Sequence, residues 1–211
     1  IACYKLEFGK VKKKSITVSR SFGQKLSSYE DIRDALIVYV QKAAGKLRNY
    51  NLFCKSISIF LKTSRYEKRL YQKTITYNLV EATTDIRTIW KTSEKLLRRI
   101  YKKSFLYNKV GVTLSDLLEV NEVQRSFLLN YKSEKIKEKE KKDMKLMEVI
   151  DNVNIRFGVG KLRLSSDRNG FFYLSKKMQI SKNNKINWLM KSNYRSPSYT
   201  TKWYDIPKVK V

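Results

Sequence analysis

Two serines flank an arginine near the start of the chain, in the run Ser19-Arg20-Ser21, and an aromatic residue and a glycine follow at once. The residues just before them, 15–18, alternate small polar with β-branched apolar side chains, which is the pattern of a half-buried strand. We therefore expect a strand that ends in two hydroxyls and a guanidinium. These side chains offer hydrogen-bond donors and positive charge.

Side chains for acid–base or metal chemistry are scarce. The chain has no histidine, which excludes Ser-His and Cys-His nucleophilic chemistry. A zinc site would need carboxylates and the two distant thiols of Cys3 and Cys54, so we expect no metal and no cofactor. The one adjacent pair of carboxylates, Glu30 and Asp31, lies in the first turn of a predicted helix, where it suits the helix dipole. An independent enzyme such as a nuclease is therefore disfavoured.

The charge balance indicates a polyanionic partner. The 211 residues include 46 Lys and Arg but 19 Asp and Glu, a formal net charge of +27. Self-repulsion of this size favours a protein whose charge is neutralised by nucleic acid, the alternative being a basic surface with no partner. The longest apolar run, 35–40, is too short to span a bilayer, and no secretory signal opens the chain. Two distant cysteines suit a reduced, cytoplasmic protein.

Hydrophobic periodicity predicts four strands and two helices between residues 14 and 118. Strand-like alternation covers 15–18, 54–62, 74–79 and 109–114, and helical spacing covers 29–49 and 86–100. A capping box of Ser27 and Glu30 opens the first helix, and Thr83-Thr84-Asp85 opens the second. The order β-α-β-β-α-β predicts an α+β fold, a split-βαβ antiparallel sheet of four strands with both helices on one face.

The alternation assigns side chains to the two faces of this sheet. The covered face would hold Ile16, Val18, Ile57, Ile59, Leu61, Ile75, Tyr77, Val110 and Val112. The other face would hold Ser15, Thr17, Ser19, Ser56, Ser58, Thr74, Thr76 and Thr113. A flat surface of hydroxyls with cations at the strand ends can lie against a sugar-phosphate backbone. Serine and threonine also suit any solvent-facing strand, and the net charge favours the first interpretation.

The chain changes character after residue 118. Residues 132–148 alternate Lys and Glu densely, which predicts a solvated helix or a spacer, and 188–211 form a polar, aromatic tail with both prolines. We therefore divide the chain into four parts: 1–13, a folded unit over 14–118, a charged helical linker over 119–150, and a small irregular module over 151–211.

Three landmarks carry a resemblance to a known family. They are Ser19-Arg20-Ser21-Phe22-Gly23 before the capped helix, 60–64 (FLKTS) at the end of the next strand, and 194–203 (YRSPSYTTKW) near the end. Together they resemble the C-terminal half of the UmuC-type Y-family translesion DNA polymerase, over essentially all 211 residues. The resemblance implies that 1–13 leave the thumb domain, that 14–118 are the little finger that grips DNA, and that 151–211 are the family's C-terminal tail.

The resemblance also implies DNA-binding residues at the ends of two neighbouring strands: Ser19, Arg20, Ser21, Lys62, Thr63 and Ser64. Gly23 would let the chain turn away after the first strand. Phe22 is expected in the core rather than in a stack on a base.

Members of this family carry a sliding-clamp peptide of the form Gln-Leu-x-Leu-Phe after the little finger. The matching place has Gln124, Phe127 and Leu128, with arginine at the second position and the Leu-Phe order reversed. Two interpretations stay open: these residues bind the clamp by inserting apolar anchors in a groove, or Phe127 and Leu128 pack on the domain's own surface.

The family's catalytic palm, with the acidic residues that hold two magnesium ions, would precede everything in this sequence. We therefore expect a non-catalytic, DNA-binding portion of a polymerase that acts in DNA repair and SOS mutagenesis. Its partners would be primer-template duplex, a separately encoded catalytic half and SOS accessory subunits, with no membrane. The alternative is a basic RNA-binding or ribosome-associated protein, although an RRM stacks bases on central-strand aromatics and Phe60 is the one such residue here.

Overall fold

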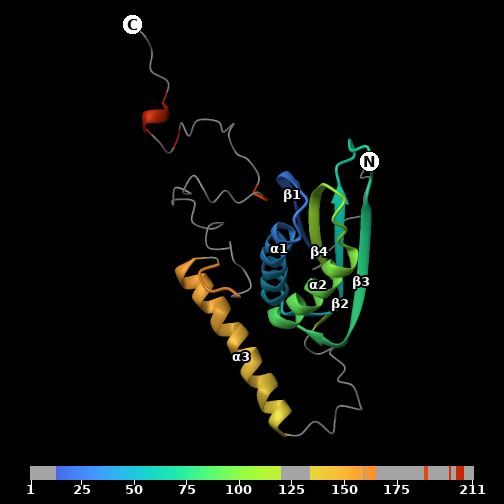
Figure 1. Ribbon diagram of the computed structural model, residues 1–211. Helices are drawn as coiled ribbons and strands as arrows, with labels where there is room; N and C mark the ends of the chain where they lie inside the picture. The colour runs from blue at the N-terminus through green and yellow to red at the C-terminus, as the bar shows by residue number, and fades with distance from the viewer. Residues whose placement is uncertain are drawn as a thin grey trace, which may run out of the picture.

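A computed structural model describes residues 13–119, 134–158, 160–164, 188–189, 200 and 203–206. The elements in these ranges follow in order (Figure 1): β1 (Ser15–Leu26), α1 (Tyr29–Asn49), β2 (Leu52–Thr63), β3 (Gln72–Thr83), α2 (Ile86–Ile100), β4 (Tyr107–Glu119), α3 (Glu134–Phe157) and the 3-10 helix η3 (Trp203–Asp205). The predicted order of four strands and two helices is confirmed. In the ranges just given, every helix is too short or too polar to cross a bilayer.

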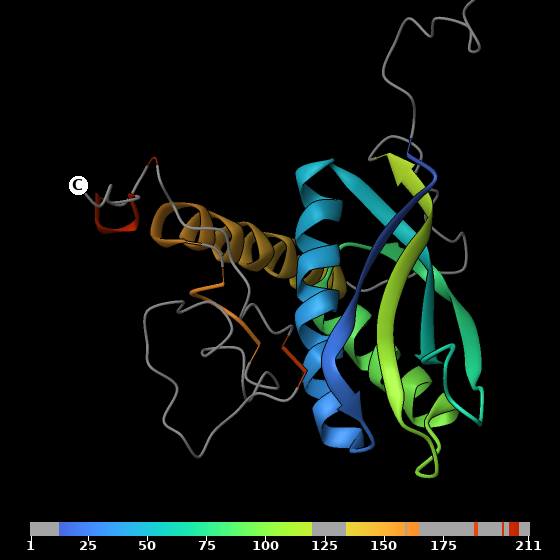
Figure 2. The ribbon, with the colours of Figure 1, turned by 90° about the horizontal axis from the view of Figure 1, so that it is seen from above.

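The strands form one antiparallel sheet in the order β1-β4-β2-β3. The central strands are therefore β4 and β2, and β1 and β3 are the edges. Figure 2 shows α1 and α2 together on one side of this sheet, so the predicted split-βαβ arrangement is confirmed.

The core lies between the sheet and these two helices. Helical spacing brings one side of α1 inward, including Ile32, Leu36 and Leu47, and all three are fully buried. Five apolar residues of α2 face inward and are buried too: Ile86, Ile89, Trp90, Leu97 and Ile100. Tyr77 differs from the prediction, because it lies on the edge strand β3 and keeps 45% of its surface exposed.

Strand β1 is much longer than its alternating start indicates. It runs through Arg20 and Gly23 to Leu26, so the expected strand end at residues 19–21 and the turn at Gly23 are wrong. The physical reason is pairing: β4 continues alongside, and an irregular stretch between Ser21 and Leu26 lets the two strands re-register at Tyr107. Phe22 is buried, which confirms its expected place in the core.

The two helices begin differently. The N-cap of α1 is Ser28, one residue after the predicted Ser27, and its side chain makes no cap hydrogen bond. Ser27 instead accepts a hydrogen bond from the hydroxyl of Tyr101 at its carbonyl oxygen, at 2.5 Å. α2 begins as predicted, because the Asp85 carboxylate accepts from the backbone N–H of Arg87 at 2.9 Å.

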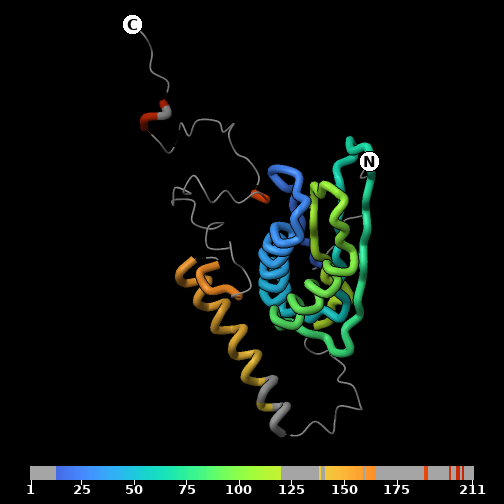
Figure 3. Tube along the Cα trace, in the orientation of Figure 1, coloured from blue at the N-terminus to red at the C-terminus, as the bar shows by residue number. Residues whose placement is uncertain are grey.

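The charged segment after the sheet forms α3, which lies beside α1 (Figures 1 and 3). Its Met147 is buried, and the Asp151 carboxylate accepts two hydrogen bonds from the Arg48 guanidinium of α1, at 2.5 and 2.7 Å. Asp143 pairs with Arg87 of α2 at 2.8 Å. The helix is therefore docked on the domain rather than a free spacer, and it continues past the division that we drew after residue 150.

Candidate nucleic-acid interface

The side of the sheet away from α1 and α2 is organised in rows that cross all four strands; we call it the open face. The register fixes four rows: Ser15, Ser115, Ser56 and Asn78; Thr17, Thr113, Ser58 and Thr76; Ser19, Gly111, Phe60 and Thr74; and Ser21, Lys109, Lys62 and Gln72. The predicted small hydroxyls all lie on this face. We call the last row, Ser21-Lys109-Lys62-Gln72, the lysine row.

In the first two rows the polar side chains bond to one another across the strands. The hydroxyls of Thr17 and Thr113 are 2.9 Å apart, and those of Ser58 and Thr76 are 2.8 Å apart. The Ser56 hydroxyl donates to the Asn78 side-chain oxygen at 2.9 Å. Such cross-strand pairs stabilise the sheet, and most of the polar groups in these two rows already have partners.

The third row is built around a close approach of an aromatic ring to the backbone. A Cβ atom at Gly111 would lie 2.4 Å from Cζ of Phe60 and 2.5 Å from Cβ of Ser19. Only glycine therefore lets the Phe60 ring lie across β4 at this point, an arrangement known from other sheets in which an aromatic residue covers a neighbouring glycine. The ring is partly buried, with the Lys62 ammonium 5.5 Å from its centroid.

The lysine row places two ammonium groups on the central strands. Lys62 of β2 lies directly opposite Lys109 of β4, and both side chains are partly buried. Among the residues that the structure describes, no carboxylate forms an ion pair with either one. Ser21 and Gln72 flank them on the edge strands.

The predicted cluster Ser19-Arg20-Ser21 is divided between the two faces. Ser19 and Ser21 lie on the open face, but strand alternation places Arg20 on the opposite side, in register with the buried Val110. The three residues were predicted to form one cluster because the strand was expected to end at residues 19–21. Lys62 joins the serines on the open face, whereas a DNA-binding role for any of these residues stays a prediction.

The other two predicted residues, Thr63 and Ser64, hold the loop between β2 and β3. The Thr63 hydroxyl accepts from the backbone N–H of Tyr71 at 2.9 Å, and the Ser64 hydroxyl accepts from that of Tyr66 at 3.4 Å. This loop displays Arg65, Lys68 and Arg69, all exposed. Its Glu67 pairs with Lys25 of β1, which joins the loop to the same end of the sheet as the lysine row.

Sequence reasoning missed Lys109 and Gly111. Both lie in the alternating run 109–114, so their face was predictable. Their neighbours were not, because the pairing of β4 with β2 depends on residues far apart in the chain. The predicted clamp residues Gln124, Phe127 and Leu128 lie outside the described residues.

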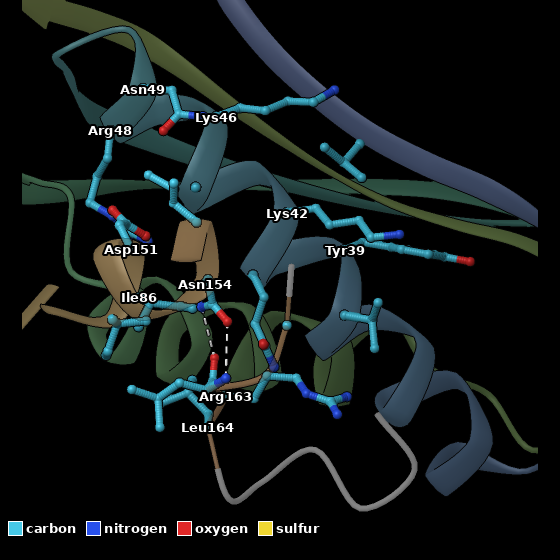
Figure 4. Close-up of a pocket in the computed structure, with 18 of the residues that line it drawn as sticks. Tyr39, Lys42, Lys46, Arg48, Asn49, Ile86, Asp151, Asn154, Arg163 and Leu164 are labelled. Carbon is cyan, nitrogen blue, oxygen red and sulfur yellow. Dashed lines mark hydrogen bonds and ion pairs between the residues drawn. The ribbon is translucent and has the colours of Figure 1, made fainter. Parts of the chain in front are cut away.

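A cavity of about 640 Å³ lies on the other side of the sheet, between β1, α1 and the chain that follows α3 (Figure 4). Five cationic side chains line it: Arg20, Lys42, Lys46, Arg48 and Arg163. Asn154 closes one wall, because its side-chain amide donates to the carbonyl of Leu162 at 3.0 Å and accepts from the N–H of that residue at 2.9 Å. The side of the domain that bears Arg20 is therefore basic as well.

The ionisable side chains with shifted pKa values serve structure. Burial alone would raise the pKa of Asp85, but hydrogen bonds from Arg87 and Thr88 outweigh it and hold the pKa below its usual range. The same balance between burial and the Arg33 guanidinium lowers the pKa of Glu94. Burial raises the pKa of the Cys54 thiol to about 12, which leaves it unreactive. Within the described ranges, no three metal-ligating side chains converge.

Comparison with family models gives two matches that divide the chain. Residues 13–127 match the impB/mucB/samB family C-terminal domain. Residues 144–209 match a domain of unknown function, DUF4113. The first match contains the whole sheet with α1 and α2, and the second begins inside α3.

Curated relatives align over almost the whole chain. Protein MucB of Salmonella typhimurium is 33% identical over 208 residues, which are 98% of this chain and 44% of the relative. Protein UmuC of Salmonella typhimurium (strain LT2) is 32% identical over 210 residues, which are 99% of this chain and 45% of the relative. The chain therefore spans less than half the length of these relatives, and the predicted resemblance to the C-terminal half of the UmuC type is confirmed.

Among solved structures, a DinB family error-prone DNA polymerase from Sulfolobus solfataricus aligns with a TM-score of 0.41 and 17% identity. The alignment covers 53% of this chain and 32% of that one.

Proposed function

Because the chain belongs to the impB/mucB/samB family, we propose that it is the C-terminal portion of a UmuC-type Y-family translesion polymerase, and that its open face binds the backbone of primer-template DNA. In this assignment residues 14–118 are the little finger. The catalytic palm lies outside these 211 residues, and the contribution of this portion to DNA repair and SOS mutagenesis is to hold the duplex.

The observation that carries the proposal is the construction of the open face. Three pairs of polar side chains bond across its strands in the first two rows and give a flat surface, and the cations of its four rows gather in one row. Contacts to phosphates fix the position of a duplex without reading its sequence, which suits a domain that must travel along any template. The net charge of +27 supplies the long-range attraction.

RNA binding is the second candidate, and a specific feature argues against it. An RRM presents several aromatic rings on its central strands for stacking with bases. Here Phe60 is the single aromatic residue in the four rows of the open face, and one side of its ring is occupied by Gly111.

Fluorescence anisotropy with a labelled primer-template duplex and a labelled single-stranded RNA tests the proposal. We expect tighter binding to the duplex, with a steep dependence on salt. Thr74→Glu puts a negative charge on the open face, and we expect it to weaken duplex binding about tenfold. Asn152→Glu, an equal change on the exposed side of α3, is the matched control.

Tighter binding to RNA, or an equal loss of duplex binding in the Thr74→Glu and Asn152→Glu variants, would show that the open face is not a DNA interface. The sliding clamp, the separately encoded catalytic half and the SOS accessory subunits remain predicted partners from the resemblance. Pull-down with each purified partner, with Phe127→Ala for the clamp, tests them one at a time.

A further inference from the structure

We propose that Lys62 and Lys109, with Ser21 and Gln72 beside them, form an anion-binding row that takes a single backbone phosphodiester, and that an empty row destabilises the fold. The identity of the ligand rests on the proposed function, whereas the anion chemistry of the row does not. Neither the sequence prediction nor the family match assigns a role to Lys109.

The geometry of the row follows from the strand register. Lys62 and Lys109 are directly opposite each other on the two central strands, and opposite residues on one face of a sheet have Cβ atoms about 5 Å apart. Both side chains point to the open face, because the next residues along each strand, Leu61 and Val110, are fully buried on the other face. The backbone therefore places the two lysine side chains side by side, within reach of one anion.

This juxtaposition is unfavourable in the free protein, because like charges directly opposite in a sheet repel. Structural cations elsewhere in the domain have carboxylate partners: Arg33 has Glu94, and Arg48 has Asp151. Lys25, at the end of β1, has Glu67. In the described part of the chain the two lysines of the row have no such partner although both are partly buried, so their positive charge is available to an anionic ligand.

An oxyanion bound between the two ammonium groups removes the repulsion and gains charge-assisted hydrogen bonds from both. The Ser21 hydroxyl on β1 and the Gln72 amide on β3 extend the set of donors to all four strands. Rows on one face of a sheet are about 7 Å apart, so the sugar attached to a bound phosphate reaches the Phe60 ring in the adjacent row. An apolar surface beside an anion site favours a phosphodiester of a nucleic acid over a simple carboxylate.

An anion-binding role predicts that removing one lysine raises the melting temperature without an anion and reduces the stabilisation that an anion gives. A purely structural role for the lysines does not predict this reversal. Without an anion, removing one lysine relieves the repulsion and raises the melting temperature. With an anion present, binding stabilises the wild-type protein by RT ln(1 + [L]/Kd), and a variant with weaker anion affinity gains less.

Thermal melting of the full chain tests this prediction in the wild type, Lys62→Gln, Lys109→Gln and the double variant. Lys73→Gln is the control, because Lys73 lies opposite Leu61 on the other side of the sheet. We expect the single variants to melt about 1–3 °C higher than the wild type without ligand. Sodium tripolyphosphate should then stabilise the wild type and Lys73→Gln more than either row variant.

Anisotropy with a short duplex completes the test. We expect the double variant to bind about tenfold more weakly, with a salt slope shallower by about 0.9 because one phosphate contact is lost, whereas Lys73→Gln keeps the slope of the wild type. A melting temperature of the row variants below that of the wild type without ligand would contradict the proposed anion-binding role of the row. An equal loss of duplex affinity in Lys73→Gln would contradict it as well.

The two proposals fail in different ways. If tripolyphosphate distinguishes the row variants but the wild type binds no duplex, the anion row stands and the DNA-binding function is wrong. If the duplex binds and the row variants bind it as well as the wild type, the function stands and the row is wrong.

Discussion

The two faces of the sheet are made by the same four strands and differ in what holds their side chains. On the covered face, branched aliphatic side chains such as Ile59 and Val112 are fully buried under α1 and α2. On the open face, hydroxyls pair across the strands, Phe60 lies across Gly111, and two lysines face each other with no carboxylate partner among the residues that the structure describes. Alternation thus lets one strand supply stability with every second residue and a binding surface with the residues between.

The largest effect is expected from breaking the covered face. Ile59→Ala deletes a fully buried side chain in central strand β2, and we expect the free energy of unfolding to fall by about 2–5 kcal/mol in urea titration. The salt slope of duplex binding by the folded protein should not change. A change in that slope would mean that the two faces are not independent.

Gly111→Ala should give the next largest effect, and this time from the open face. The added methyl group collides with the Phe60 ring, so we expect a loss of about 1–3 kcal/mol from overpacking. Adding Phe60→Ala removes the collision with the ring but not the close contact with Cβ of Ser19, and should recover part of the loss. Double-mutant analysis of urea unfolding measures the coupling, and purely additive losses would contradict the proposed contact.

We expect low pH to lower the stability of the domain through two carboxylates on its helix side, Asp85 and Glu94. The folded-state pKa values of Asp85 and Glu94 are lowered, so their contribution to stability is present above the unfolded-state pKa and is lost as the pH falls through the folded-state pKa. Asp85→Asn keeps a residue that can cap α2 but removes the negative charge that pairs with Arg87 and favours the helix N-terminus, so we expect a loss of about 0.3–1 kcal/mol at pH 7.

Melting curves at pH 7 and pH 3 check this prediction. The variant should lose less stability than the wild type over that interval. An equal loss in both proteins would show that Asp85 does not contribute to the acid sensitivity.

The smallest effect is expected for the hydroxyl pairs. Ser58→Ala leaves Thr76 exposed to water, so we expect a loss of about 0.5 kcal/mol or less and an unchanged salt slope. Lys62→Gln provides the contrast, because it should change the salt slope while the fold is retained. Similar effects of the two substitutions on binding would erase the distinction between the hydroxyl rows and the lysine row.

Much of the fold could be predicted from local patterns. Period-2 and period-3.6 spacing identified each strand and helix of the sheet domain, and α1 runs from Tyr29 to Asn49 as predicted. The full length of β1 could not be predicted, because Arg20 and Gly23 interrupt the alternation and are held by a partner strand much later in the chain. The docking of α3 could not be predicted either, because it depends on pairs of residues far apart in the chain, such as Arg48 with Asp151.

The candidate site was predictable only in part. Alternation placed Ser19 and the other hydroxyls on one face, and this was confirmed by the register. Grouping by proximity in sequence misplaced Arg20, because neighbours in a strand point in opposite directions. Lys62 and Lys109 meet only through the pairing of β2 with β4, which no local pattern encodes.

The strand order has a consequence for how the protein is made. β4 leaves the ribosome after the other three strands, yet it lies between β1 and β2, and β1 has no other neighbour in the sheet. A nascent chain that ends before Tyr107 therefore holds a β2–β3 hairpin and a first strand with nothing to pair with. Such late, long-range pairing slows folding. The last strand completes the sheet and brings Lys109 to Lys62 in the same step, so an unfinished chain cannot display the lysine row.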